Sequence, residues 1–337
     1  MLWSFNGVAI RELATQFLSL AEKQKATVPL MTGHRLMGTS LLETGDIAQG
    51  RAHYNKALAL YDPAEHRPLA TRFGTDAEVS ILSFRSRAMW LLGYPEAALA
   101  DADRALKDAR EIGQAATLML TLFYASFPHT SCGNYATVNA LVDELVALAD
   151  EKSAPLWKAL ATINEGLLLA VDGNPSDAIK LFTSGMAAYQ STGATLYRPQ
   201  HLSYLASAYA ELGQFDDAWR FMGEAMTAVE ITKERWWEAE VNRVAGEIAL
   251  KSPKPGAAKA EAYFERALAV ARKQEAKSWE LRAAMSMARL WRDQGKRDEA
   301  RDLLAPVYGW FTEGFDTLDL RQAKELLNTL GTEGRKS

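Results

Sequence analysis

The stretches AELGQFDDAWRFMGEAM (residues 210–226) and AVDGNPSDAIKLFTSGM (residues 170–186) repeat one pattern at a distance of 40 residues. In each, a glycine is followed after five residues by alanine, after nine by a bulky apolar residue and after twelve by a small residue. Glycine ends a helix readily because it adopts positive φ at little cost. The later spacings mark one face of a second helix. The pattern therefore predicts a helix, a tight turn and an antiparallel helix.

The same pattern recurs along most of the chain, with a small residue seven positions before each turn glycine. Further copies have their turn glycines at Gly45, Gly93, Gly133 and Gly295. In one interrupted copy Gly246 takes the small position, and the turn KSPKPGAAK (251–259) contains two prolines. Proline cannot continue a helix, so the first helix of this copy should stop near Lys251. A fixed period of this length indicates a solenoid, in which each helix pair buries its apolar face against its neighbours.

The spacing resembles the tetratricopeptide repeat, whose usual period is about 34 residues. Longer helices or longer linkers would both account for the extra residues, and the two alternatives remain open at this point. We expect an all-α, tetratricopeptide-like helical-hairpin solenoid, a right-handed superhelix of about seven helix pairs with a period near 40 residues. It should form a single domain over residues 1–331, with residues 332–337 as a disordered tail and an irregular stretch at 62–78.

Composition limits the compartment and the kinds of partner. The formal net charge of −4 disfavours direct binding of nucleic acid, which needs a basic surface. One cysteine, Cys132, excludes an internal disulfide and is typical of a reducing compartment. The longest apolar stretch, 115–127, is too short to cross a membrane, and the N-terminus does not resemble a signal peptide. We therefore expect a cytoplasmic protein without membrane contact.

Motifs for catalysis or cofactor binding are missing from the sequence. It contains no phosphate-binding loop and none of the patterns GxGxxG, HExxH, CxxC or GxSxG. The five histidines are far apart in the chain, so a solenoid should not bring them together on a metal. The sequence therefore predicts a non-enzymatic protein without cofactor or metal.

The first helix of each pair should line the concave face of the superhelix, so its inward residues are candidates for ligand binding. Phe123 and Phe127 give the middle of this groove an apolar character. Toward the C-terminal end the inward residues are mainly charged. There we expect the groove to include Trp236, Glu240, Arg243, Arg282 and Arg289.

Two features of this charged end have alternative interpretations. The arginine side chains suit recognition of a carboxylate or phosphate, but they could equally pair with Glu240, Glu247 or Glu280 of the chain itself. Trp236 and Trp237 would point about 100° apart on a helix. They should therefore not both be buried against the same neighbour, and one could face the groove.

Several segments resemble one family. They are ERWWEAEVNRVAGEIAL (234–250), the block 260–327, and RFGTD (72–76) followed by MWLLGYPEAAL (89–99). The resemblance is to the C-terminal tetratricopeptide-like region of bacterial multidomain proteins. These join an adenylate/guanylate cyclase domain or a winged-helix regulator domain to a predicted ATPase. The sequence has neither the phosphate-binding loop nor the metal carboxylates of those domains, so no catalytic residue carries over.

The resemblance implies a sensing or scaffolding arm that acts on a regulator elsewhere. The helix expected at 10–24 would be the second of a pair, so we expect this chain to be, or to descend from, the C-terminal part of a longer protein. The leading prediction is a protein-interaction module of a bacterial signalling or regulatory system. It would bind a peptide or partner domain, such as a cyclase- or ATPase-type regulator, in its groove. The alternative is a small-molecule-sensing arm of such a regulator.

Overall fold

Helices and turns make up the described part of the chain. The computed structural model describes residues 5–253 and 256–331, and no strand occurs among them. The disordered tail expected at 332–337 lies outside the described residues. The all-α prediction is thus confirmed for the part that the structure describes.

Seven antiparallel helix pairs account for most of the described residues, as the repeat predicts. Their first helices are α2 (Thr27–Glu43), α6 (Ala77–Leu91), α8 (Ala115–Cys132), α10 (Pro155–Val171), α12 (Arg198–Glu211), α14 (Glu238–Lys251) and α16 (Lys277–Asp293). Their second helices are α3 (Ile47–Ala59), α7 (Pro95–Ile112), α9 (Tyr135–Glu151), α11 (Pro175–Ser191), α13 (Phe215–Thr232), α15 (Ala257–Lys273) and α17 (Arg297–Gly309). The helix α1 (Gly7–Gln24) packs on α2, and α18 (Leu318–Gly331) packs on α17.

In the middle of the chain, longer helices account for the period of 40 residues. The consecutive helices α9, α10 and α11 each have 17 residues, and turns of three residues, 152–154 and 172–174, join them. A 17-residue helix makes nearly five turns. The extra residues of these repeats therefore widen the helical layer, whereas before α12 and α14 the connections are longer and the helices have 14 residues.

The turns contain a second series of left-handed residues that the sequence analysis missed. Gly173, between the two helices of a pair, has φ of +79° as expected. Between successive pairs, Ser153 and Lys233 also adopt positive φ although they are not glycine. Helices thus end with a left-handed residue both within a pair and between successive pairs. Only the turns within a pair have a glycine at a regular position in the sequence.

The stretch 62–78, expected to be irregular, contains short helices. These are α4 (Pro63–His66), the 3₁₀ helix η1 (Arg67–Leu69) and α5 (Ala70–Phe73). Asp62 caps α4 because its side chain accepts a hydrogen bond from the Ala64 backbone N–H. The insertion is therefore ordered and bridges the first two helix pairs.

Small residues hold the two helices of each pair close together. Ala206 on α12 and Ala218 on α13 are both fully buried. Their positions are the ones that the repeat assigns to the contact between the two helices. The register of the repeat is therefore the one read from the sequence.

We predict that Ala218→Trp will destabilise the protein by about 1–3 kcal/mol or more, because an indole cannot fit between α12 and α13. The exposed Thr227 on the same helix offers the matched control, Thr227→Trp. Thermal unfolding of both variants checks the prediction. Equal melting temperatures for the two would contradict the assigned contact.

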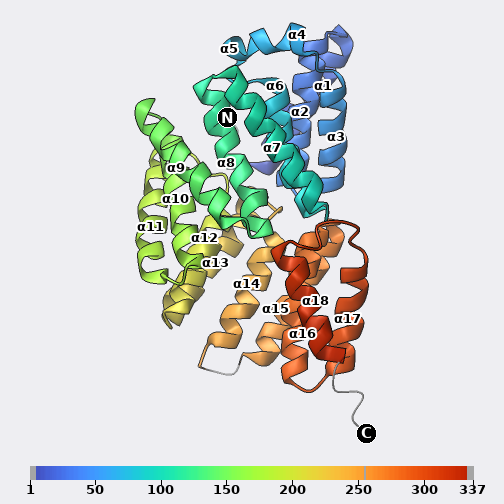
Figure 1. Cartoon of the computed structure of the whole chain (residues 1–337), viewed down its shortest axis with the longest axis vertical. Helices are drawn as coiled ribbons and strands as arrows, with labels where there is room; N and C mark the ends of the chain where they lie inside the picture. Colours follow the sequence, from blue (N-terminus) through green and yellow to red (C-terminus); the bar gives the residue numbers. More distant parts are fainter. Residues whose placement is uncertain (1–4, 254–255, 332–337) are drawn as a thin grey trace.

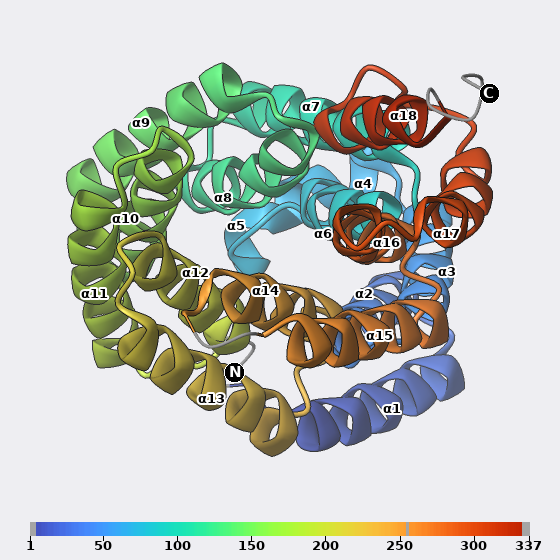
Figure 2. The same ribbon diagram turned by 90° about the horizontal axis from the view of Figure 1, so that it is seen from below.

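The solenoid makes more than one turn of a right-handed superhelix, and its second turn rests on its first. In Figure 2 the chain runs around the axis through α8–α13 and returns with α14–α18 onto the side of α1–α7. Figure 1 shows α16–α18 directly below α6 and α7, and α16 contacts α6 while α18 contacts α8. We call this contact the seam. It joins residues 7, 43–45, 90–97 and 131–133 of the first turn to residues 233–236, 274–282 and 310–318 of the second.

Close packing and specific hydrogen bonds form the seam. The rings of Trp90 and Trp279 meet edge to face with their centroids 4.8 Å apart. The hydroxyl of Ser278 donates to the main-chain oxygen of Trp90, 188 residues away in the chain. The Gly314 N–H donates to Glu96 Oε1 at 2.7 Å across 218 residues. Units that are distant in the sequence are therefore in direct contact, which a purely nearest-neighbour solenoid does not show.

Candidate functional site

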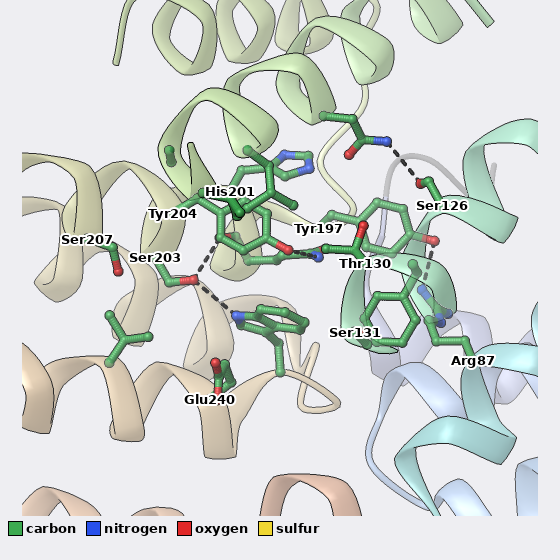
Figure 3. Close-up of a pocket in the computed structure, with 18 of the residues that line it drawn as sticks. Arg87, Ser126, Thr130, Ser131, Tyr197, His201, Ser203, Tyr204, Ser207 and Glu240 are labelled. Carbon is green, nitrogen blue, oxygen red and sulfur yellow. Dashed lines mark hydrogen bonds between the residues drawn. The ribbon is translucent and has the colours of Figure 1, made fainter. Parts of the chain in front are cut away.

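A pocket of about 270 Å³ lies on the concave face of the superhelix. Its walls come mainly from the first helices of successive pairs, from α6 through α16 (Figure 3). Six of the seven residues that the sequence analysis selected line it: Phe123, Phe127, Trp236, Glu240, Arg243 and Arg282. The seventh, Arg289, does not line the pocket. It donates a hydrogen bond of 3.3 Å to Gln322 on α18.

Two longer loops place aromatic side chains at the centre of the superhelix. The segments before α12 and α14 are longer than the three-residue turns on either side of α10, and these two helices have only 14 residues each. Tyr197 ends the first of these loops, and Trp236 and Trp237 end the second. All three side chains are buried and line the pocket.

The expectation that Trp236 and Trp237 could not both be buried against the same neighbour is wrong, because both are buried and both rings pack on Phe127. It assumed helical spacing, whereas both residues precede the first residue of α14. Their rings pack edge to face with centroids 4.9 Å apart. The Trp236 indole N–H donates to Glu234, and the Trp237 indole N–H donates to Ser203, each at 3.0 Å. Each tryptophan therefore buries its ring and satisfies its polar atom.

The charged end of the pocket is internally paired. Arg243 donates to both oxygens of Glu240 at 2.7 and 2.8 Å, and it also contacts Glu247. Burial alone would raise the pKa of Glu240, but the Arg243 guanidinium holds that pKa below its ordinary value. Arg282 donates from Nε to Asp319 at 2.7 Å. Of the two interpretations, the structure thus favours pairing within the chain.

The partners of the arginines differ in part from those proposed. The sequence does not predict Asp319, on α18, as the partner of Arg282, because the two residues lie far apart in the chain. Glu280, in the first turn of α16, instead pairs with Arg272 at the end of α15 and with Lys277 at the start of α16. The charges at this end are therefore balanced before any ligand binds.

Arg87 is the main pocket residue that the sequence analysis missed. It is 2% exposed and forms a buried ion pair with Glu43. Burial raises the pKa of the Glu43 carboxyl, and the adjacent guanidinium opposes this increase. Arg87 also donates to the Tyr197 hydroxyl at 3.0 Å and lies over the ring of Trp236 at 4.5 Å. No local sequence pattern distinguishes this arginine from an exposed one.

Uncharged polar groups complete the lining. Asn164 on α10 donates from its amide to Ser126 at 3.1 Å, and Gln200 on α12 donates to the Tyr204 hydroxyl at 2.7 Å. Figure 3 shows Ser126 and Tyr204, the partners of these two amides, beside the pocket. Both carboxamides also carry an oxygen that can accept a hydrogen bond. The lining can therefore contact an apolar group and several polar atoms of one ligand.

Burial holds a thiol and an imidazole of this region in their neutral forms. Burial raises the pKa of the Cys132 thiol to about 12, so the thiol stays protonated and weakly reactive. The histidine that lines the pocket, His201, is buried, and burial lowers its pKa to about 3. Within residues 5–253 and 256–331 no three metal-ligating side chains converge. The described helices also include none that could cross a membrane.

Comparisons with known proteins agree with the fold. A tetratricopeptide repeat model matches residues 281–306. The Rap conjugation gene regulator of plasmid pLS20 in complex with the Phr* peptide is similar in structure, with a TM-score of 0.63 and 11% identity over 91% of this chain and 78% of that one. A Rap protein complexed with Competence and Sporulation Factor gives a TM-score of 0.62 and 11% identity over 94% of this chain and 81% of that one. The apo form of RapI gives 0.52 and 12% over 96% and 99%. No curated protein sequence matches this chain.

At these identities the likeness shows the fold alone. The chain is a tetratricopeptide-like solenoid, and the Rap structures share that architecture over most of its length. The wider setting suggested by the sequence, a cyclase- or ATPase-containing protein, is not represented among these matches.

Proposed function

We propose that this chain is a non-enzymatic binding module of a bacterial regulatory system, which takes a peptide or a segment of a partner protein into its concave pocket. The observation that carries the proposal is the pocket itself. It is an aromatic site with hydrogen-bonding side chains, and in this structure its charges are already balanced. Such sites bind through a few well-placed anchors.

The size of the pocket favours a ligand that inserts only part of itself. Pockets for whole small ligands usually measure about 300–1,000 Å³. The 270 Å³ found here suits one or two side chains of a peptide. Two of the similar structures are Rap proteins solved with Competence and Sporulation Factor and with the Phr* peptide, which supports a peptide as the ligand class here.

A second candidate function is the sensing of a small molecule by a cyclase- or ATPase-type regulator. The burial of the aromatic wall favours it, because a small apolar ligand would be almost enclosed. In both versions the partner lies in the cytoplasm, and no nucleic acid or membrane is contacted directly.

Site-specific photo-cross-linking tests the proposal. Val171 lines the rim of the pocket and is 43% exposed, so p-benzoylphenylalanine at this position should leave the fold intact. Ser184 on the exposed surface of α11 provides the matched control position. We expect a peptide or protein to cross-link from position 171 in native lysate, and not from position 184.

A variant that fills the pocket provides a second test within the same cross-linking experiment. Ser207 lines the pocket, and Ser207→Trp should occupy part of its volume. We expect this change to lower cross-linking from position 171 by about tenfold or more. The mass of the cross-linked product distinguishes a peptide from a small molecule. The proposal would be overturned if positions 171 and 184 gave the same cross-linked products and if Ser207→Trp did not reduce them.

A further inference from the structure

The pocket is built across the seam between the two turns of the superhelix. Arg87 on α6 and Phe127 on α8 belong to the first turn, whereas Trp236 and Arg282 belong to the second. Phe127 packs edge to face on Trp236 with their centroids 5.7 Å apart. The pocket therefore has its observed shape only while the second turn rests on the first.

A small group of buried residues holds this part of the seam together. The main-chain oxygen of Glu43, at the end of α2, accepts hydrogen bonds from the N–H groups of Arg235 at 2.8 Å and Trp236 at 3.3 Å. The side chain of Glu43 pairs with Arg87, whose guanidinium lies over the Trp236 ring. We call Glu43, Arg87, Tyr197 and Trp236 the latch. It joins α2 and α6 of the first turn to the loop before α14.

One member of the latch has a strained backbone. Tyr197 adopts φ of +65° although it is not glycine, and it is buried. A left-handed conformation costs an L-residue roughly 1–2 kcal/mol. Two sets of contacts offset this cost. The Tyr197 N–H donates to the Glu234 carboxyl group at 3.0 Å, and its hydroxyl contacts Arg87 and Tyr124. Opening the latch would release this strain and remove one wall of the pocket.

We propose that closure of the seam regulates ligand binding. A ligand that contacts both walls binds tightly only to the closed form, so its apparent affinity scales with the fraction of molecules in which the latch is closed. By reciprocity, the ligand favours closure to the same extent. The proposal takes the identity of the binding site from the proposed function, but it makes a separate claim about how that site forms.

A disulfide across the seam can fix the closed form. A Cβ atom at Gly7 on α1 would lie 3.1 Å from both Cβ and the main-chain oxygen of Lys233, so the two residues must separate slightly to reach the Cβ–Cβ distance of disulfides, about 3.5–4.5 Å. The nearby Thr44 side chain must move slightly, since its Cγ2 would be 2.8 Å away. The double variant Gly7→Cys/Lys233→Cys, oxidised or reduced, therefore compares the clamped and free seam in one molecule.

A second variant weakens the latch without removing its main-chain contacts. Glu43→Gln keeps the shape of the side chain and the backbone oxygen, but it removes the charge opposite Arg87. We expect amide hydrogen exchange to become about tenfold faster at 233–238 in the seam and at 197–204 in the pocket wall. Exchange in α11, away from the seam, should not change. Adding the oxidised Gly7–Lys233 clamp to Glu43→Gln should restore slow exchange in the pocket wall.

These results separate the proposal from a merely structural role. Unchanged exchange at 197–204, or equal acceleration in α11, would overturn it, as would a clamp that slows exchange only at the seam. If Glu43→Gln does not fold, the oxidised and reduced forms of the clamp in the native background give the same comparison. None of these measurements needs a ligand. The proposed function can therefore fail in the cross-linking experiment while the coupling of seam and pocket stands, and the reverse also holds.

Discussion

Arg87→Met should lower the free energy of unfolding by about 3–5 kcal/mol, because it leaves a buried carboxylate without its counter-ion. Glu43 is 1% exposed and Arg87 is 2% exposed, so water cannot replace the lost partner. The change also removes the hydrogen bond to Tyr197 and the contact with the Trp236 ring. Urea unfolding monitored by circular dichroism measures the effect.

The double variant Glu43→Gln/Arg87→Met serves as the control for this prediction. Removing both charges leaves no unpaired buried ion, so the double variant should be more stable than Arg87→Met alone by at least about 1 kcal/mol. The exposed pair of Arg220 and Asp217 offers a comparison, and Arg220→Met there should have little effect on stability, because water screens an exposed ion pair. If Arg87→Met proved as mild as Arg220→Met, the buried ion pair would not stabilise the seam.

The sequence predicts those features of the fold that depend on one repeat and its neighbour. A turn glycine such as Gly173 and a close-contact residue such as Ala218 recur at fixed positions, so their roles can be read in each copy. Periodicity along the first helices also places Phe123 and Phe127 on the concave face. This is why five of the seven selected residues lie in one pocket, while a sixth, Trp236, reaches it from the loop before α14. That these residues bind a ligand remains a prediction.

Contacts across the seam could not be predicted in this way. The position of α16 under α6 depends on small rotations added over several units, and the repeat pattern does not encode their sum. The packing of Trp90 on Trp279 and the hydrogen bond from Ser278 to Trp90 follow from that stacking. Each partner taken alone resembles an ordinary helix residue. The sequence analysis therefore found the pocket residues but not the contacts that close the pocket.

Departures from regular spacing were the second source of error. The sequence analysis treats Trp236 and Trp237 as helical, whereas α14 starts only at Glu238. The residues just before α14 form a loop that directs Trp236 inward. The loop that ends at Tyr197 shortens α12 in the same way. Both loops supply aromatic walls of the pocket, so the site is built where the repeat is least regular.

Glu234→Gln should remove a fall in stability that the native protein is expected to show as the pH rises. Burial and the nearby Glu43 raise the pKa of Glu234 to about 8, although the N–H donors of Trp236 and Tyr197 and the charge of Arg87 oppose the increase. A carboxyl group whose pKa is higher in the folded state binds more protons there than in the unfolded state. Its contribution to stability is complete below the ordinary pKa of about 4.5 and is lost as the pH rises to about 8.

The interval from pH 6.5 to pH 8 isolates this effect. His201, which folding keeps neutral by lowering its pKa to about 3, changes stability only below about pH 6.5. Between pH 6.5 and pH 8.5 we expect the native protein to lose about 1–3 kcal/mol of unfolding free energy, and Glu234→Gln to lose less than half as much. Urea unfolding at the two pH values measures both. The exposed Glu230, changed to Gln, is the matched control and should keep the native dependence of stability on pH.

Equal slopes for native protein and Glu234→Gln would mean that Glu234 is ionised throughout this interval. Its negative charge would then lie beside that of Glu43, and Arg87 would have to neutralise two buried carboxylates instead of one.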